Sequence, residues 1–184
     1  MLGRHKMYIY VIQPLPPKKY LCVNFENSAE HGKALNKFKI RNSKPLAVLR
    51  DDLSQKKQYN TAQVRSYCKK LATELNGSGY VVVAGAAVYN NFRQTYVIYL
   101  NSNNSKAVYV GQTIYPRELR IKQHQLGIRP ARVFKNNKNI PHSLAYELMD
   151  NKKYFKLEAA LEAEANLAHE LKKGGYEVFG GTKN

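Results

Sequence analysis

The alternation of apolar and polar residues predicts several strands. Residues 7–12 are rich in tyrosine, isoleucine and valine, and the prolines that follow should end that strand. Residues 46–49 predict a second short strand, and the small and β-branched residues of 80–88 predict a buried one. By contrast, the polar stretch 51–59 predicts a loop, and 18–44 predicts irregular structure with one short helix near 28–37.

Two longer segments carry apolar residues at helical spacing. The first begins at Asn60 or Thr61, either of which can cap a helix, and runs to residue 75. Its apolar stripe consists of Val64, Cys68, Leu71 and Leu75. The second covers residues 154–173 and should end at the glycine pair 174–175. Its stripe consists of Leu157, Leu161, Ala168 and Leu171.

Glu164 lies in the middle of the apolar stripe of the second helix. A carboxylate that faces a core is costly unless it is paired or binds a metal. Two roles for Glu164 follow. It either forms a buried ion pair with Arg120 or binds a hard divalent cation such as Mg²⁺, which prefers oxygen ligands and takes few of them from protein.

Between the two helices, two β-type runs flank a polar connection rich in asparagine and serine. The runs, residues 96–100 and 107–111, both contain tyrosine and predict a hairpin with a longer loop. Pro116 can then open a helix, because its missing N–H would have no intrahelical partner there. Arg120 and His124 are four residues apart and share one face of that helix. Tyrosine hydroxyls, a guanidinium and an imidazole should therefore converge at the open end of the hairpin.

This ordered series resembles the motif series of the GIY-YIG nucleases over about residues 95–179. The matching residues are Tyr96-Val97-Ile98-Tyr99, then Tyr109-Val110-Gly111-Gln112-Thr113, then Arg120 with His124. The first motif departs from the pattern, because Gln94-Thr95-Tyr96 stands in place of Gly-Ile-Tyr. Arg117 competes with Arg120 as the motif arginine, and the four-residue spacing to His124 favours Arg120.

The resemblance implies an α+β fold. Its C-terminal module would have the order β-β-α-α-β-α, with a small central antiparallel sheet flanked by helices. Residues 129–138 would supply the second helix of this order and residues 143–148 the third strand. Family members often have an asparagine near the C-terminus, but no asparagine stands at the similar position, residues 176–177, and Asn184 lies farther on.

The resemblance also implies a hydrolytic site. Tyr96 and Tyr109 would position the attacking water, and Arg120 would bind phosphate oxygens. His124 would relay a proton or hold Tyr109 in place. Glu164 would bind the metal, Mg²⁺ or Mn²⁺, because it lies on a late helix and apolar residues follow it three and four positions on, as in the family.

The chain has 30 basic and 13 acidic residues, a formal net charge of +17, and both halves are basic. Such a charge attracts a polyanion, with nucleic acid ahead of an acidic membrane surface. Six basic residues near the predicted site are candidates for nucleic-acid binding, although a solvated basic face is the alternative. They are Arg117, Lys122, Arg129, Arg132, Lys135 and Lys138.

Cysteine content and hydropathy favour an intracellular protein, located wherever its DNA is. Cys22 and Cys68 are too few for a disulfide framework and lack the spacing of a zinc site. The apolar run near the N-terminus is too short for a signal peptide, and no run is long enough to span a membrane. Since the chain also lacks a glycine-rich phosphate loop, we expect no nucleotide cofactor.

We therefore expect two parts. Residues 1–92 form a basic α+β extension for DNA recognition, dimerisation or stability alone, and residues 93–184 form the nuclease domain. The expected function is a Mg²⁺-dependent DNA endonuclease. A restriction or homing enzyme ranks above the repair branch of the family, which normally adds a cysteine-rich zinc domain. With one site per chain, cutting both strands favours a homodimer or sequential nicking. The alternatives are an RNase or nuclease toxin, an inactive nucleic-acid-binding module and a ribosome-associated basic protein.

Overall fold

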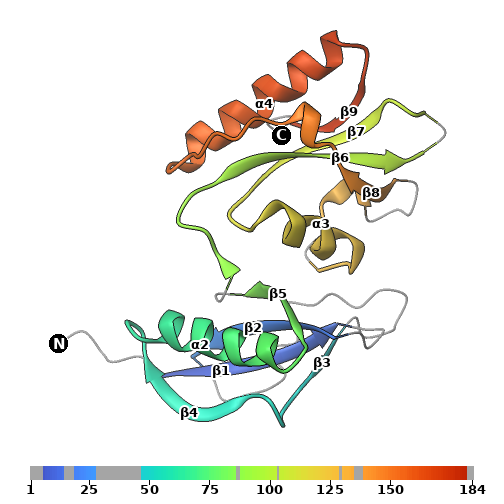
Figure 1. Ribbon diagram of the computed structural model, residues 1–184. Coiled ribbons are helices and arrows are strands. Elements are labelled where there is room, and N and C mark those ends of the chain that lie inside the picture. Colours follow the sequence, from blue (N-terminus) through green and yellow to red (C-terminus); the bar gives the residue numbers. More distant parts are fainter. Residues whose placement is uncertain are drawn as a thin grey trace. The chain divides into compact units, whose positions relative to one another are not determined.

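The computed structural model describes residues 6–14, 19–27, 47–85, 88–102, 104–128, 130–134 and 139–181. The chain divides into two compact units, which we call the N-terminal unit (residues 1–89 with 126–129) and the C-terminal unit (90–125 with 130–184). Each unit combines a mixed sheet with helices (Figure 1). The predicted α+β class is therefore confirmed.

The sheet of the N-terminal unit is built around strand β1 (Lys6–Pro14). Strands β2 (Tyr20–Glu26), β3 (Ala47–Leu49) and β4 (Gln55–Asn60) pair with it antiparallel, and β5 (Val81–Gly85) runs parallel to β2. The strands predicted from residues 7–12, 46–49 and 80–88 are thus present. The predicted loop over 51–59 is wrong in its second half. Strand β4 forms there because Tyr59 is buried opposite Met7, while its polar neighbours remain exposed at the sheet edge.

Helix α2 (Val64–Gly77) covers one face of this sheet (Figure 1). Its predicted stripe is buried, and it packs with Ile9, Val11, Leu21 and Val23 of the two central strands. The helix begins later than predicted. The Asn60 side chain accepts a hydrogen bond from the Gln63 N–H at 3.0 Å, and this turn precedes the helix. The short helix predicted near 28–37 lies outside the described residues.

The sheet of the C-terminal unit has the strand order β8-β6-β7-β9. Strands β6 (Gln94–Asn101) and β7 (Ala107–Thr113) form the predicted hairpin, and β8 (Ile140–Leu144) pairs antiparallel with β6. Strand β9 (Glu177–Gly180), which the sequence analysis missed, runs parallel to β7, so the sheet is mixed rather than wholly antiparallel.

Strand β8 begins and ends earlier than predicted, and residues 146–148 form a 3₁₀ turn, η3 (Tyr146–Leu148). Pro141 is tolerated in β8 because an edge strand leaves one row of its backbone groups unpaired. Of the helix predicted over 129–138, the described residues show a short 3₁₀ turn, η2 (Arg132–Phe134). The rest of that prediction lies outside the part of the chain that the structure describes.

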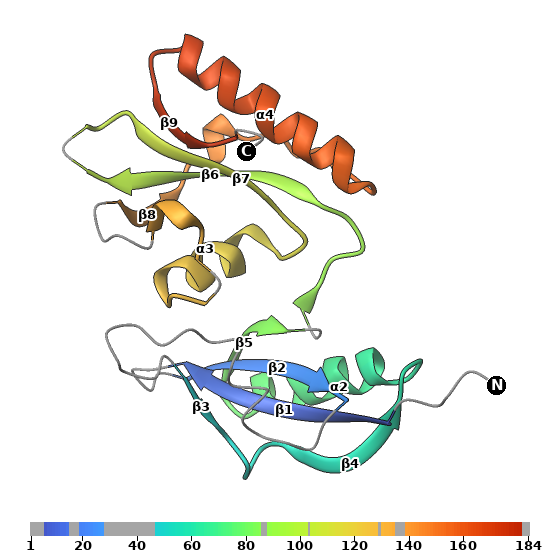
Figure 2. The same cartoon turned by 180° about the vertical axis from the view of Figure 1, so that it is seen from behind.

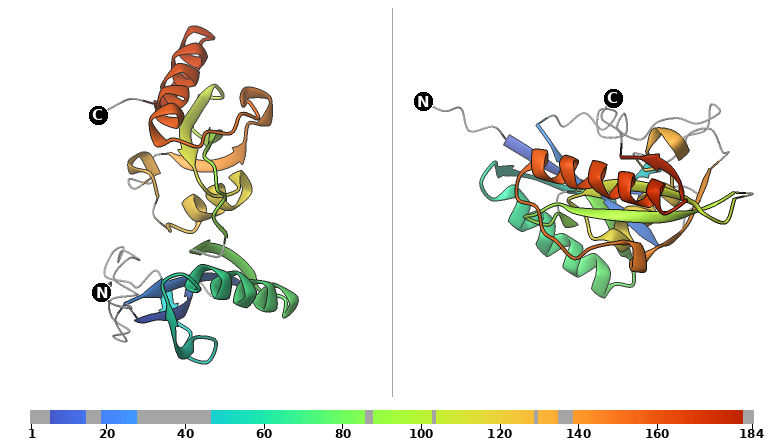
Figure 3. Two further views of the ribbon diagram at one scale, coloured as in Figure 1. Left: turned by 90° about the vertical axis from the view of Figure 1, so that its left-hand side faces the viewer. Right: turned by 90° about the horizontal axis from the view of Figure 1, so that it is seen from above.

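Two helices cover opposite faces of the C-terminal sheet (Figure 2). Helix α4 (Leu157–Lys173) packs through Ala168 and Leu171 on the face that carries the valines of β6 and β7, and Figure 3 shows it running along the sheet. Helix α3 (Arg117–Gln125) packs through Ile121 on the face that carries Tyr96 and Ile98. Within the described residues, no helix is long and apolar enough to cross a membrane.

The predicted apolar stripe of α4 is only partly correct. Leu157 and Leu161 are 42% and 37% exposed. The buried residues of the helix are Ala160, Ala168 and Leu171, so its buried face is rotated away from both leucines. Glu164 is half-buried beside this face.

Candidate active site

Tyr96 and Tyr109 lie on the same face of the hairpin. Tyr96 stands opposite Gly111, and Tyr109 stands opposite Ile98, two residues along β6. The ring centroids of the two tyrosines are 5.9 Å apart. A Cβ atom at position 111 would lie 2.7 Å from Tyr96 Oη and 2.9 Å from Tyr109 Cε1. Glycine at this position therefore provides the space in which the Tyr96 hydroxyl group lies across β7.

His124 of α3 makes its hydrogen bond with Tyr96, not with Tyr109 as one of its predicted roles required. The Nε2 atom lies 2.8 Å from Tyr96 Oη, and the Nδ1 atom accepts the backbone N–H of Ala131 at 3.3 Å. Burial, and then the charge of Arg120, lowers the pKa of His124 to about 2, so the ring is neutral. Since Nδ1 accepts, the single ring proton sits on Nε2, and His124 donates to Tyr96 Oη.

Both tyrosine hydroxyls are protonated in the isolated protein. Burial raises the pKa of Tyr96, and the Arg120 guanidinium opposes this effect. Burial and then the neighbouring Tyr96 raise the pKa of Tyr109, again against Arg120. The ring of Phe134 closes this cluster, with its centroid 4.9 Å from Tyr109 and 4.6 Å from His124. The tyrosines therefore act as neutral groups until a further positive charge arrives.

Arg120 projects from α3 toward these side chains. Its charge and a side-chain hydrogen bond act to lower the pKa of Tyr96, against the effect of burial, and its charge also acts to lower the pKa values of Tyr109 and His124. Its Nη1 group donates to Gln123 Oε1 at 2.8 Å, and Gln123 is buried. Gln123 is a residue of the site that the sequence analysis missed. Its position three residues after Arg120 could have indicated it, because side chains at this spacing meet on a helix.

Arg117 has a different environment. Its Nε group donates to the Thr95 carbonyl at 2.8 Å, Nη1 donates to Asn151 Oδ1 at 3.2 Å, and Nη2 donates to the Asp150 carbonyl. The side chain is 8% exposed. Arg117 therefore connects the start of β6 with the segment before α4. Because its guanidinium is buried and hydrogen-bonded, little of the side chain is accessible for the nucleic-acid contact that the sequence suggested.

Glu164 reaches the site from α4. Its Oε1 atom accepts the backbone N–H of Gly181 at 3.3 Å. Burial raises the pKa of Glu164, and the backbone N–H groups of Gly181 and Gln112 oppose that rise. The Glu164 charge in turn adds a smaller rise to the pKa of Tyr96 and of Tyr109.

Gly181 is required for this contact with Glu164. It has a positive φ of 69°, and a Cβ atom there would lie 2.2 Å from the Cβ of Ala168. The segment after β9 can thus approach α4 only with glycine at this position. That approach places the Gly181 N–H on the carboxylate.

The donor set suits a metal that takes few protein ligands. Among the described residues, no group of three or more His, Cys, Asp or Glu side chains could hold a metal ion. A zinc-type site needs such a group. Mg²⁺ instead keeps several waters and is often held by one or two carboxylates together with substrate phosphates. A single half-buried carboxylate, Glu164, fits the second class of site.

The remaining predicted nucleic-acid contacts divide into two sets. Lys122 on α3 and Arg132 in η2 are exposed on the C-terminal unit. Arg129, Lys135 and Lys138 lie outside the described residues, as does Asn184. A role in binding nucleic acid remains a prediction for all five basic residues.

The family comparison covers this same part of the chain. A family model described as the GIY-YIG catalytic domain matches residues 93–177. Comparisons with curated proteins and with solved structures gave no match. The matched segment contains Tyr96, Tyr109, Arg120, His124 and Glu164, and the family indicates a nuclease that acts on nucleic acid. The C-terminal unit thus belongs to the GIY-YIG nuclease superfamily, as the sequence motifs predicted.

Proposed function

We propose that the chain is a metal-dependent endonuclease that hydrolyses phosphodiester bonds in DNA, with Mg²⁺ or Mn²⁺ as its cofactor. The observation that supports this most is the convergence of two tyrosines, His124, Arg120 and Glu164 in a GIY-YIG domain. The net charge of +17 supports a polyanionic substrate.

Arg120 would bind the scissile phosphate. Hydrolysis gathers negative charge on the phosphoryl oxygens, and preorganised donors that meet this charge lower the barrier. A guanidinium offers two parallel N–H groups to two oxygens, which lysine cannot do. Gln123 accepts one Arg120 N–H and so holds the guanidinium in place.

Tyr96 would first lose its phenolic proton to solvent, and the resulting phenolate would then accept a proton from the attacking water, a role for which it is better placed than Tyr109. Its oxygen already accepts the Nε2–H of His124, and Arg120 is close by. Both groups would stabilise a phenolate at this position. Tyr109, which has the other hydroxyl on this face, would orient the water. His124 would then act by positioning and stabilising Tyr96.

Glu164 would hold the metal ion. When bound there, a divalent cation would supply charge for the phosphoryl oxygens and for the leaving oxygen. The Gly181 N–H fixes one carboxylate oxygen, so the direction of the group is set before the metal arrives.

A restriction or homing enzyme remains the branch that we propose. Cys22 and Cys68 are both buried, and both belong to the N-terminal unit. They therefore do not supply the zinc domain of the repair branch. In this proposal the N-terminal unit contributes DNA recognition or dimerisation, and two copies of the chain would cut the two strands.

The test is cleavage by the purified full chain. Supercoiled plasmid and an RNA of matched sequence are incubated with Mg²⁺, with Mn²⁺ and with EDTA. The proposal predicts discrete DNA fragments with either metal and none with EDTA. Faster cleavage of the RNA would favour an RNase, and binding without cleavage of either polymer would favour an inactive binding module.

A further inference from the structure

Phe155 is the most exposed large hydrophobic residue in the described part of the chain, at 74%. It immediately precedes the residue at which α4 is capped, and the exposed Leu157 and Leu161 follow it along the helix. Lys152, Lys153 and Lys156 surround it in sequence and are all exposed. An exposed aromatic ring among lysines needs an explanation, because water solvates the charges but not the ring.

The segment that carries Phe155 is held firmly by hydrogen bonds. Arg93 and Tyr154 exchange two backbone hydrogen bonds of 2.7 and 2.8 Å. The Asp150 carboxylate accepts the hydroxyl groups of Thr95 at 3.3 Å and Tyr154 at 3.2 Å, and Arg117 donates to the Asp150 carbonyl. Phe155 is therefore presented to solvent by a fixed backbone.

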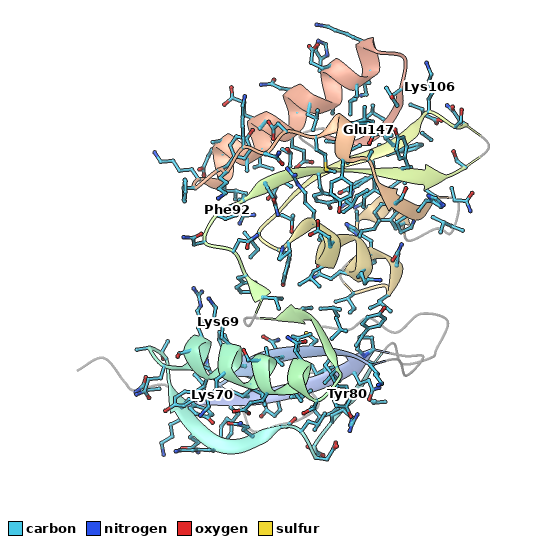
Figure 4. All side chains as sticks on the ribbon, viewed as in Figure 1. Lys69, Lys70, Tyr80, Phe92, Lys106 and Glu147 are labelled. Carbon is cyan, nitrogen blue, oxygen red and sulfur yellow. The ribbon has the colours of Figure 1, made fainter. Side chains whose placement is uncertain are left out.

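Positive charges and aromatic rings alternate at this end of the C-terminal unit. The Nζ atom of Lys153 lies 4.8 Å from the centre of the Phe92 ring, which Figure 4 shows near the start of β6. Within the described ranges, none of Lys152, Lys153 and Lys156 has a carboxylate within 4.0 Å. The exposed Phe155 ring, the half-buried Phe92 ring and the lysines beside them suit a nucleic-acid strand whose phosphates and bases both need partners.

The same helix connects Phe155 with the candidate active site. Leu157 and Leu161 lie between Phe155 and Glu164 along α4. From Leu157 to Glu164 the helix rises about 10 Å. A strand that crosses this end of α4 would thus have its reacting phosphate within a few nucleotides of Phe155.

We propose that Phe155 stacks on an unpaired base of the nucleic-acid substrate, while Lys152, Lys153 and Lys156 contact the neighbouring phosphates. The inference rests on the proposed function, since it concerns the substrate of the same site. It specifies the substrate class as DNA that is opened beside the scissile phosphate. A duplex offers such a base only where it is distorted at the target, and a flap or bubble offers it from the start.

The first test compares binding of two DNAs by the full chain in EDTA, so that cleavage plays no part. One is a duplex, and the other is the same sequence with a short unpaired tract. Phe155→Ala should weaken binding to the opened DNA by on the order of tenfold, because one base–aromatic stack is worth about that much, and should leave the duplex nearly unchanged. Phe155→Tyr should restore the wild-type affinity. Ile140→Ala, which removes another exposed apolar side chain on edge strand β8, is the matched control and should change neither affinity.

A second test detects the stack directly. The chain has no tryptophan, so Phe155→Trp introduces a single tryptophan at the proposed contact, and its fluorescence can be excited selectively in the presence of the 14 tyrosines. Opened DNA should quench its fluorescence, and duplex should quench it much less. The inference would be overturned if opened DNA did not quench the tryptophan, or if Phe155→Ala weakened binding to both DNAs equally. It would also be overturned by a Phe155→Ala variant that changes only the oligomeric state in sedimentation, because the patch would then join two copies of the chain. Since these tests use no metal, their failure is distinct from a failure to cleave.

Discussion

The proton on His124 decides what Tyr96 can do. Because the Ala131 N–H occupies Nδ1, the imidazole has only an N–H to offer at Nε2, and Tyr96 Oη receives it. A neutral histidine of this kind cannot remove the tyrosine proton. It lowers the cost of a negative charge on Tyr96 once the phenolic proton has been lost to solvent.

The buried, neutral state of His124 predicts a pH dependence of stability. Its pKa in the folded chain, about 2, is far below the ordinary value of 6.5. Below pH 6.5 the unfolded chain therefore binds a proton that the folded chain does not. The contribution of His124 to the free energy of unfolding is therefore complete above pH 6.5. Below that pH it falls by about 1.4 kcal/mol for each pH unit.

Denaturant unfolding of the C-terminal unit at pH 7, 6 and 5 measures this effect. In the His124→Asn variant the free energy of unfolding should depend less steeply on pH over this range. In His169→Asn, at an exposed position on α4, the pH dependence should stay as in the wild type. An unchanged slope in His124→Asn would show that the ring takes up a proton in the folded protein.

Arg117 and Arg120, only three residues apart, should respond in opposite ways to substitution. Arg117→Ala leaves the carbonyl groups of Thr95 and Asp150 without their donor and should cost about 2–4 kcal/mol of stability. Arg120→Ala should change stability by less than about 1 kcal/mol and slow cleavage by about a hundredfold or more. Thermal melts and single-turnover rates on both variants separate the two roles. An Arg120→Ala variant that is destabilised but still active would contradict this assignment of roles.

At the scale of elements, the approach of the segment after β9 to α4 depends on Gly181. Gly181→Ala places a Cβ against Ala168 at a positive φ, so it should destabilise the C-terminal unit by about 1–3 kcal/mol and slow cleavage by releasing Glu164. Gly77→Ala is the control, because no atom lies within 4 Å of its added Cβ at the end of α2. That variant should be neutral or stabilised by up to about 1 kcal/mol. Melting curves and initial cleavage rates are measured for both variants. Equal melting temperatures and rates in the two variants would contradict the predicted clash at Ala168.

The elements that could be predicted are those whose own sequence has a recognisable local pattern. The β6–β7 hairpin has two apolar runs and a polar loop, and α4 has a long periodic pattern with glycines at its end. Strands β4 and β9 have no such signal. Each forms because a neighbouring strand offers free backbone groups, and a local pattern does not contain that neighbour. The rotation of α4 was missed for the same reason, since tertiary packing buries Ala160 and leaves Leu157 exposed.

The site divides in a similar way. Of the side chains that the motif spacing indicated, Tyr96 is hydrogen-bonded to His124, and its ring centroid lies 5.9 Å from that of Tyr109. The catalytic roles of these residues, of Arg120 and of Glu164 stay predictions. The partner of His124 could not be predicted, because Ala131 comes from the segment after α3 and its N–H fixes the proton position. The buried setting of Arg117 depends on Asp150 and Asn151, more than thirty residues away.

At the scale of the whole molecule, the net charge of +17 predicts binding to DNA that depends strongly on salt. The logarithm of the affinity should fall linearly with the logarithm of salt concentration, with a slope of about −0.9 for each phosphate neutralised. Replacing Lys122 or Arg132 by Gln should each reduce the magnitude of the slope by about 1. Lys173→Gln, at the far end of α4 in an ion pair with Glu170, should leave the slope unchanged. Fluorescence anisotropy at 50–300 mM salt measures these slopes, and an affinity that salt does not weaken would contradict a phosphate-based contact.

The central claim is that Arg120 of α3, Glu164 of α4 and Tyr96 of β6 form one hydrolytic centre. Single-turnover cleavage with DNA affinity measured in parallel tests it most directly, on Arg120→Ala, Glu164→Gln and Tyr96→Phe. Each variant should bind DNA within about threefold of wild type and cleave about a hundredfold more slowly or worse. The Arg120→Ala/Glu164→Gln double variant should be little slower than the slower single variant, because groups that act as a unit are not additive. Cleavage at the wild-type rate by Glu164→Gln would contradict the claim.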